Sequence, residues 1–253
     1  MLRKLLQATR NYFCQRQKNT SFLMPVEFEK RDIKIFDYVI NNQLTMVSSE
    51  RLTATIQACK YVILNEIPGD FVECGVWRGG NSIAAKLLFE AYGSNKKVIL
   101  MDTFAGMTEP TELDETTRHK IPAKKRFQKE QKESHNGWCY ASLEEVKENF
   151  TKAGAGPVGV EYIVGDISET LRTTEDLPSE ISILRLDTDW YESTKFEMEV
   201  LYPLLTSGGV LIVDDYGHWN GARKAIEEYF NNTAVKCPLL QYTDYTGRMG
   251  IKK

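Results

Sequence analysis

From residue 70 onward, short continuous apolar runs alternate with longer stretches whose apolar positions have a helical period. The runs predict five buried strands, at residues 71–76, 97–101, 160–164, 181–186 and 210–213. The periodic stretches predict helices at residues 81–92, 193–201 and 221–230. Continuous apolar strands joined by helices are typical of a parallel sheet that helices cover on both faces. The pattern therefore predicts an α/β fold with a mostly parallel sheet.

Two stretches do not follow this alternation. Residues 1–68 carry helical patterns at 32–40 and 49–64, so we expect a helical N-terminal extension ahead of a domain that spans 69–253. Residues 106–141 are polar and highly charged and show no period. An insertion of this length in a compact domain is usually a lid, a substrate loop or a disordered segment, and we expect a lid.

The C-terminal residues predict a different kind of strand pair. Residues 239–244 and 248–253 lie on either side of a turn at Gly247. Two short strands around such a turn are typical of an antiparallel hairpin. We therefore expect a hairpin at the edge of an otherwise parallel, Rossmann-like sheet.

Composition narrows the class of protein. The chain has 253 residues, 42% of them hydrophobic and 26% charged, which fits one globular domain with an appendage. A net charge of −3 leaves no electrostatic footprint for nucleic acid. No apolar stretch approaches the ~20 residues that span a bilayer, so we expect no membrane span. The basic N-terminus lacks the apolar core of a secretory signal, and we expect an ordinary solvated helix there.

The cysteines bear on the compartment. They number five and never form a C-x-x-C pair, standing at Cys14, Cys59, Cys74, Cys139 and Cys237. This spacing argues against a disulfide framework and against a zinc knuckle. We therefore expect a protein of the reducing cytoplasm.

Four aspartates follow two of the predicted strands. Asp187 and Asp189 come directly after the run 181–186, and the adjacent pair Asp214 and Asp215 follows the run 210–213. Carboxylates that are buried together repel one another and lose their hydration, so they need a compensating cation. Mg²⁺ takes a few carboxylates and leaves positions for water and substrate. Acidic turns at strand ends are common, but two such turns on neighbouring strands predict a metal site.

A second constellation follows the first three strands. Residues 73–80 read E-x-G-x-x-x-G-G, with Glu73 beside Gly75 on a strand-to-helix turn. This spacing is not the dinucleotide fingerprint, and a glutamate there suits an ammonium group better than a phosphate. Asp102 is placed to accept hydrogen bonds from ribose hydroxyls, and Asp166 from an adenine amine. An amino-acid end and a nucleoside end without phosphate describe S-adenosylmethionine.

At this point the chain resembles a known family. The glycine turn and the motifs at residues 101–106, 186–194 and 208–219 are similar to those of the macrocin O-methyltransferase family, over roughly residues 45–231. The segment 44–51 resembles the family's segment that closes over the cofactor. The resemblance implies a class I methyltransferase fold for residues 69–253 and sugar O-methylation that depends on Mg²⁺ and S-adenosylmethionine.

The resemblance also implies roles for individual residues. Asp187, Asp214 and Asp215 would hold the metal, and Asp189 would be the general base. The residues expected at the cofactor are Thr45, Met46, Glu73, Gly75, Ser82, Asp102, Phe104, Asp166 and Ile167. His218 is a rival base, because it lies in the loop after the metal pair and an imidazole titrates in a suitable range.

Other functions stay open from the residues alone. An Asp-x-Asp at a strand end is also the metal-nucleotide signature of many glycosyltransferases, although that function leaves Asp102 and the glycine turn without a role. A non-catalytic module that binds S-adenosylmethionine is a third alternative. We expect a sugar-containing small molecule or a glycan as the acceptor. The helical N-terminal extension is a plausible dimer element, so a homo-oligomer is also an open expectation.

Overall fold

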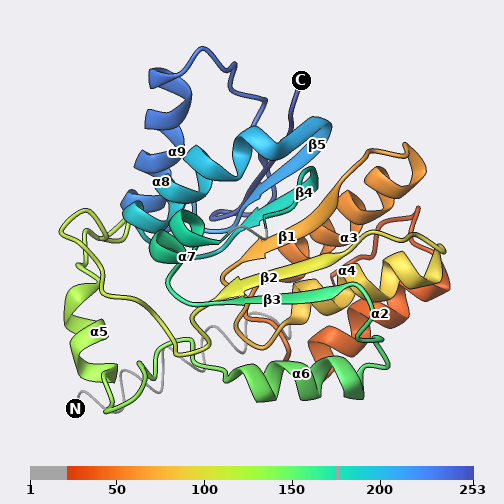
Figure 1. Cartoon of the computed structure of the whole chain (residues 1–253), viewed down its shortest axis with the longest axis horizontal. Coiled ribbons are helices and arrows are strands. Elements are labelled where there is room, and N and C mark those ends of the chain that lie inside the picture. The colour runs from red at the N-terminus through yellow and green to blue at the C-terminus, as the bar shows by residue number, and fades with distance from the viewer. Residues whose placement is uncertain (1–21, 175–176) are drawn as a thin grey trace.

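The computed structural model describes residues 22–174 and 177–253, so the basic N-terminal helix expected above lies outside the described residues. The strands form one sheet in the order β3-β2-β1-β4-β5-β7-β6 (Figure 1). They are β1 (Asp70–Cys74), β2 (Val98–Asp102), β3 (Val160–Val164), β4 (Ile181–Leu186), β5 (Leu205–Val213), β6 (Gln241–Tyr242) and β7 (Arg248–Ile251). The first five are parallel, and β7 is antiparallel to both β5 and β6. The predicted fold class is confirmed.

Helices cover both faces of this sheet (Figure 1). One face carries α2 (Lys30–Asn41), α3 (Ser49–Leu64), α4 (Gly80–Ala91) and α6 (Leu143–Lys152). The other face carries α7 (Ile167–Thr173), α8 (Tyr191–Val200), the 3-10 turn η1 (Tyr202–Leu204) and α9 (Asn220–Asn232). Successive strand residues point to opposite faces, so Phe71 packs in the first core and Val72 in the second. Burial on both faces explains why these strands are continuously apolar.

The structure corrects several predicted boundaries. The fifth strand begins at Leu205, not at residue 210, because the polar stretch 206–209 forms a bulge between two paired parts of the strand. The first strand of the C-terminal hairpin, predicted at residues 239–244, is shorter and consists of β6 alone. The sequence analysis also missed α6 and α7. The seven residues of α7 span too few turns for a helical period to stand out. A serine cap marks the start of α6, where Ser142 accepts a hydrogen bond from the Glu145 amide.

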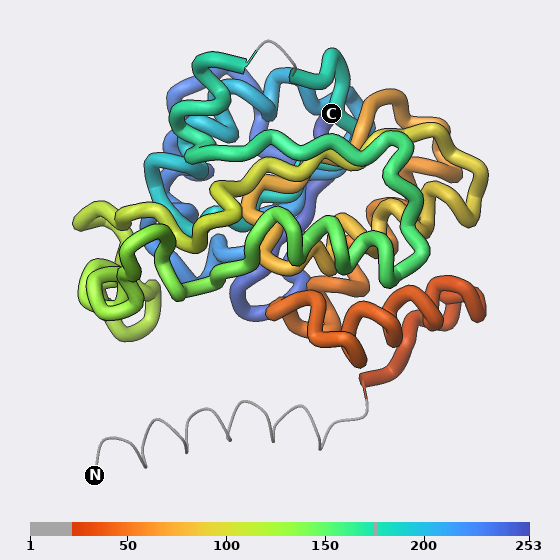
Figure 2. Tube along the Cα trace, turned by 60° about the horizontal axis from the view of Figure 1, so that its bottom comes forward, coloured from red at the N-terminus to blue at the C-terminus, as the bar shows by residue number. Residues whose placement is uncertain are grey.

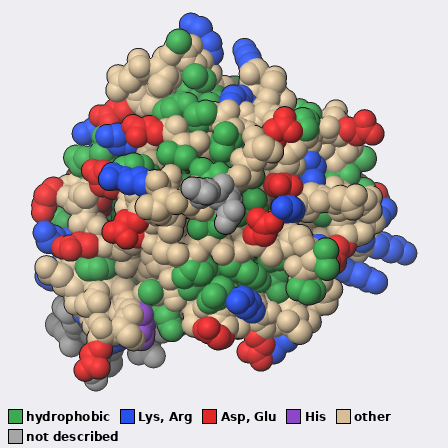
Figure 3. Space-filling model, in the orientation of Figure 1, with side chains coloured by type: hydrophobic (Ala, Val, Ile, Leu, Met, Phe, Trp, Pro, Cys, Tyr) green, Lys and Arg blue, Asp and Glu red, His purple; other side chains and the backbone are tan. Residues whose placement is uncertain are grey.

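The described part of the N-terminal extension packs on the same core as the sheet. Phe36 and Val39 of α2 and Leu52 and Ile56 of α3 are buried in the cluster that contains Phe71 of β1. Figure 2 shows α2, in red-orange, at the lower margin of the described part of the molecule, where it packs on α4 and α3. Among the described residues, no helix is long and apolar enough to cross a membrane. On the face drawn in Figure 3, basic and acidic side chains are interspersed.

The charged insertion contains one short helix, α5 (Lys124–Glu130), and projects from the side of the molecule (Figures 1 and 2). Its ends are attached to the sheet domain. Trp138 packs against Trp190 and Trp219, with ring centroids 5.4 and 6.0 Å away. The buried carboxylate of Asp114 accepts a 2.8 Å hydrogen bond from the Tyr191 amide at the start of α8. The expectation that the insertion, residues 106–141, acts as a lid stays a prediction.

The parallel strands end at one edge and bring both predicted sites together. The amide of Asp187 donates to the carbonyl of Cys74 (2.8 Å), and the amide of Asp214 donates to the carbonyl of Leu186 (2.9 Å). Gly75 lies so close to the next strand that a Cβ atom on it would meet the Asp187 carbonyl oxygen at 2.1 Å. Only glycine fits at this turn, because its φ of +79° also disfavours a side chain.

Candidate functional site

A cavity of about 230 Å³ lies at the carboxyl ends of the parallel strands. The segment before α3 and the ends of β1, β2 and β3 line one part of it, and the ends of β4 and β5 line the other. Ligands of open α/β sheets bind at this edge. The predicted cofactor and metal sites therefore share one cavity.

The three predicted metal ligands converge. Asp187 follows β4, whereas Asp214 and Asp215 follow β5, and their carboxylate oxygens lie within 4.8 Å of one another. Burial raises the pKa of Asp187 well above its ordinary value, and the Arg185 guanidinium opposes this shift. Burial and then the charge of Asp214 raise the pKa of Asp215. Both shifts mean that burial and the neighbouring carboxylates disfavour the charged form of each aspartate.

Asp189 lies beside this cluster and lines the cavity. Its backbone has a φ of +70°, an uncommon left-handed conformation for a residue with a side chain. Burial raises its pKa well above the ordinary value, and the neighbouring charges of Asp215 and Asp187 raise it further. The predicted base and the predicted metal ligands are therefore neighbours.

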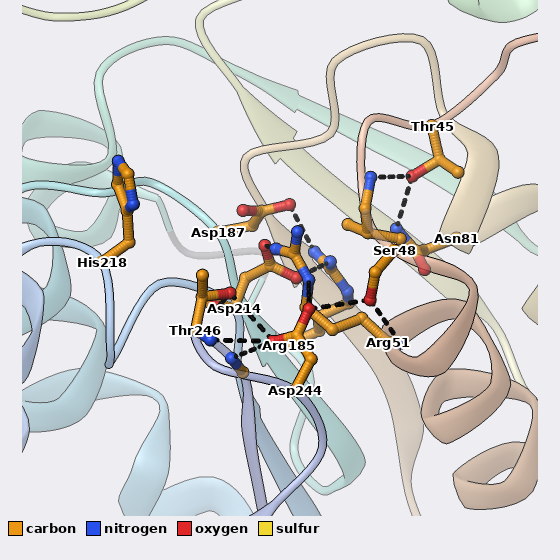
Figure 4. Close-up of polar contacts among 12 residues, drawn as sticks. Thr45, Ser48, Arg51, Asn81, Arg185, Asp187, Asp214, His218, Asp244 and Thr246 are labelled. Atoms are coloured by element: carbon orange, nitrogen blue, oxygen red, sulfur yellow. Dashed lines mark hydrogen bonds and ion pairs between the residues drawn. The ribbon is translucent and has the colours of Figure 1, made fainter. Parts of the chain in front are cut away.

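Two arginines in the cluster were missed by the sequence analysis. Arg185 is 1% exposed and points from β4 into the carboxylates (Figure 4). It donates to Asp187 at 2.6 Å and to Glu73 at 3.1 Å, and it contacts Asp214. Arg51 of α3 also contacts Asp214. An arginine inside a fully buried, mostly apolar strand was the available signal for Arg185, because a buried guanidinium needs anionic partners.

The donor set fits a divalent cation. The cluster brings six carboxylates and two guanidinium groups together: Glu73, Asp187, Asp189, Asp214, Asp215 and Asp244 with Arg51 and Arg185. The acidic groups outnumber the basic ones, and carboxylate oxygens are the ligands that Mg²⁺ prefers. A bound cation would offset the repulsion among these carboxylates.

Several residues predicted for the cofactor line the cavity. They are Thr45, Met46, Gly75, Asp102 and Ile167. The Asp102 carboxylate accepts hydrogen bonds from the amides of Val76 (2.6 Å) and Phe104 (2.7 Å). Burial raises the pKa of Asp102, and these hydrogen bonds from backbone amides oppose that shift.

The other predicted cofactor residues do not line the cavity. Glu73 is buried and accepts hydrogen bonds from Ser82 and Arg185, so it links the glycine turn to the metal ligands. Burial raises its pKa to about 7. Asp166 caps α7 by accepting a 2.8 Å bond from the Ser168 amide. Phe104 contacts the site through its backbone amide, which donates a hydrogen bond to Asp102.

His218, the rival base, does not line the cavity. Its Nδ1 lies 3.1 Å from the Tyr245 hydroxyl, and its ring packs on Trp219. Figure 4 shows it apart from Asp187 and Asp214. Burial lowers its pKa, although the charge of Asp215 opposes that shift. Of the two candidate bases, Asp189 lines the cavity and His218 does not.

Comparisons with known proteins agree on one family. The family model for Macrocin-O-methyltransferase (TylF) matches residues 5–249. The 8-demethyl-8-(2,3-dimethoxy-alpha-L-rhamnosyl)-tetracenomycin-C 4'-O-methyltransferase of Streptomyces olivaceus is 33% identical over 204 residues, covering 80% of this chain and 73% of the relative. The demethyldecarbamoylnovobiocin O-methyltransferase of Streptomyces niveus is 32% identical over 189 residues, covering 74% and 68%.

Solved structures show the same similarity. The O-methyltransferase NovP superposes with a TM-score of 0.72 at 30% identity, over 83% of this chain and 82% of that one. The calicheamicin methyltransferase CalS11 superposes with a TM-score of 0.57 at 16% identity, over 89% and 94%, and supports the fold alone. The family match begins well before residue 45, so the N-terminal extension lies within the region that the family shares.

Proposed function

Because this chain belongs to the macrocin O-methyltransferase family and is therefore an O-methyltransferase, we propose that it methylates a sugar hydroxyl of a glycosylated natural product. The methyl donor would be S-adenosylmethionine, and the reaction would depend on Mg²⁺. One observation carries this proposal. The carboxylates for a metal and a base line the same cavity as the residues suited to the cofactor.

The chain's own residues supply binding and orientation. Asp102 would accept hydrogen bonds from the ribose hydroxyls. These would replace some of the hydrogen bonds that it now accepts from backbone amides. Gly75 gives the backbone room to approach the cofactor, and Thr45 and Met46 lie over the same cavity. Asp166 would reach the adenine from the start of α7. Holding donor and acceptor in line is itself a large part of the rate enhancement.

The acceptor hydroxyl has to lose a proton during the transfer. Asp189 lines the cavity beside the metal ligands and would take that proton. Asp187, Asp214 and Asp215 would hold Mg²⁺. A bound Mg²⁺ would stabilise the negative charge that develops on the acceptor oxygen. Arg185 would orient two of these ligands through its contacts with Asp187 and Asp214.

The acceptor class comes from the relatives. One relative acts on a rhamnosyl tetracenomycin, and a third, 30% identical over 199 residues, is a mycinamicin III 3''-O-methyltransferase of Micromonospora griseorubida. A glycosylated small molecule is therefore the acceptor to test first, with a glycan as the alternative. Among the described residues, Cys59, Cys74, Cys139 and Cys237 carry free thiols, which fits the cytoplasm that we propose as the compartment.

The metal ligands give the direct test. Each of Asp187→Asn, Asp214→Asn and Asp215→Asn should lower the rate of methyl transfer to a rhamnosylated acceptor by about 100-fold or more. Each should leave binding of S-adenosylhomocysteine within a few-fold, because the cofactor contacts come mainly from β1, β2 and β3. Rates would be measured with isotopically labelled S-adenosylmethionine, and cofactor affinity by calorimetry.

Two controls separate the alternatives. Full activity in protein that metal analysis shows to be free of divalent cations would reject the metal role. Thermal shift with S-adenosylhomocysteine and with UDP-sugars distinguishes a methyltransferase from a glycosyltransferase. A ligand at about a hundredfold excess over its Kd should stabilise the fold by ~2.7 kcal/mol. Stabilisation by UDP-sugars alone would favour the glycosyltransferase.

A further inference from the structure

Asp214 has a guanidinium group on each of its two carboxylate oxygens. Arg185 contacts Oδ1 from β4, and Arg51 contacts Oδ2 from the first turn of α3 (Figure 4). The Asp214 side chain is 3% exposed, so these two contacts dominate its surroundings. A metal ion that binds Asp214 would therefore lie beside two positive charges, and its binding is favoured if one guanidinium moves away.

The two arginines differ in how firmly they are held. Arg185 is 1% exposed and is also bound to Glu73 and Asp187. Removing it from the cluster would leave several buried carboxylates without their cation, at a high free-energy cost. The Arg51 side chain is 16% exposed and lines the cavity, so it can move toward solvent.

Arg51 also has a second anionic partner. Its Nε lies 3.0 Å from Oδ2 of Asp244. The other oxygen of Asp244 is fixed by the amides of Thr246 (2.9 Å) and Gly247 (2.7 Å), and Ser48 donates to Oδ2 at 2.8 Å. Asp244 is therefore a fixed acceptor. Arg51 can leave Asp214 and keep an ion pair.

We propose that Arg51 acts as a displaceable internal cation, which neutralises Asp214 when the metal is absent and leaves Asp214 but stays paired with Asp244 when the metal binds. The inference rests on the proposed metal site. It makes Arg51 a positioning residue that competes with the metal. The consequence is a metal affinity lower than the carboxylates would give without Arg51.

The test measures metal binding itself. Mn²⁺ would be titrated into the full chain without cofactor and followed by calorimetry and by electron paramagnetic resonance. Arg51→Met removes the charge at similar length and should tighten Mn²⁺ binding by about tenfold. Arg51→Lys keeps the charge and should stay within about threefold of the unmodified chain. Arg31→Met, which removes an exposed arginine paired with Glu29 on α2, should change the affinity by less than about twofold.

A double-mutant cycle tests the role of Asp244. Asp244→Asn retains an oxygen for the Thr246 and Gly247 amides and removes the charge that receives Arg51. It should weaken Mn²⁺ binding by about fivefold in the unmodified chain and by less than about twofold in Arg51→Met. Equal weakening in both backgrounds would mean that Asp244 acts independently of Arg51, and would overturn the displacement step.

The outcomes separate this inference from the proposed function. If the unmodified chain binds Mn²⁺ and Asp187→Asn does not, the metal site stands. Unchanged or weaker binding by a folded Arg51→Met variant, with folding checked by circular dichroism, would then overturn the inference alone. If the unmodified chain binds no Mn²⁺, the metal site and the inference are both rejected.

Discussion

Thr188 donates a 2.8 Å hydrogen bond to the carboxyl group of Glu197, which is fully buried in α8. Thr188 stands between Asp187, the proposed metal ligand, and Asp189, the proposed base. The bond therefore ties the loop that carries both of these aspartates to a helix behind it. The second oxygen of Glu197 has no hydrogen-bond partner among the described residues. A buried carboxyl group in this position is costly once it ionises.

This relationship predicts a pH dependence of stability. Burial raises the pKa of Glu197 from the ordinary 4.5 to about 8. Between these values the folded state holds a proton that the unfolded state releases, so this group's contribution to stability falls as pH rises from about 4.5 to about 8. The loss is about 1.4 kcal/mol per pH unit at most.

Glu197→Gln should remove that dependence, because glutamine keeps an acceptor for Thr188 and carries no charge. Chemical denaturation at pH 5 to 9 should show a variant that becomes more stable, relative to the unmodified chain, as pH rises. A constant difference between the two proteins across this range would show that Glu197 does not titrate in the folded state.

Asp102→Ala should weaken cofactor binding. It removes the expected ribose acceptor and also frees the Val76 and Phe104 amides that shape the cavity. Charge-assisted hydrogen bonds are worth about 1.5–3 kcal/mol, so the Kd for S-adenosylhomocysteine should rise by roughly 10- to 150-fold. Calorimetry measures this directly. An unchanged Kd would place the ribose elsewhere.

Asp189 and His218 can be distinguished as bases. Asp189→Asn should lower kcat by about 100-fold or more with Mn²⁺ affinity kept within a few-fold. His218→Gln should lower kcat by less than about threefold, because the imidazole faces Tyr245 and not the cavity. The reverse order of effects would make His218 the base and Asp189 a supporting residue.

Hydrogen exchange can test whether the insertion acts as a lid. We expect its middle to gain protection when S-adenosylhomocysteine, Mg²⁺ and an acceptor bind together, across residues 120–138. The Trp138 end is already packed on Trp190, so its protection should rise least. Strands β4 and β5 serve as the internal control and should hardly change. Equal, slow exchange in the free and bound protein would identify the insertion as scaffold and not as a lid.

The sequence alone determined the fold class and the acidic ends of the strands. Continuous apolar runs separated by helical periods are a local pattern, and burial on both faces requires that pattern in a parallel sheet. The order of elements then places every strand's carboxyl end at one edge. For this reason Asp102, Asp187 and the Asp214–Asp215 pair were predicted as site residues. The structure adds that all four line one cavity.

Only the tertiary structure decided which charges meet. Arg51 lies 163 positions from Asp214, and no local pattern relates a residue on a helical extension to the end of the fifth strand. Glu73 was expected to face the cofactor, yet strand register turns its side chain toward Arg185 behind the cavity. Side-chain direction at a strand end depends on register and on neighbouring charges, and both of these are set only when the sheet assembles.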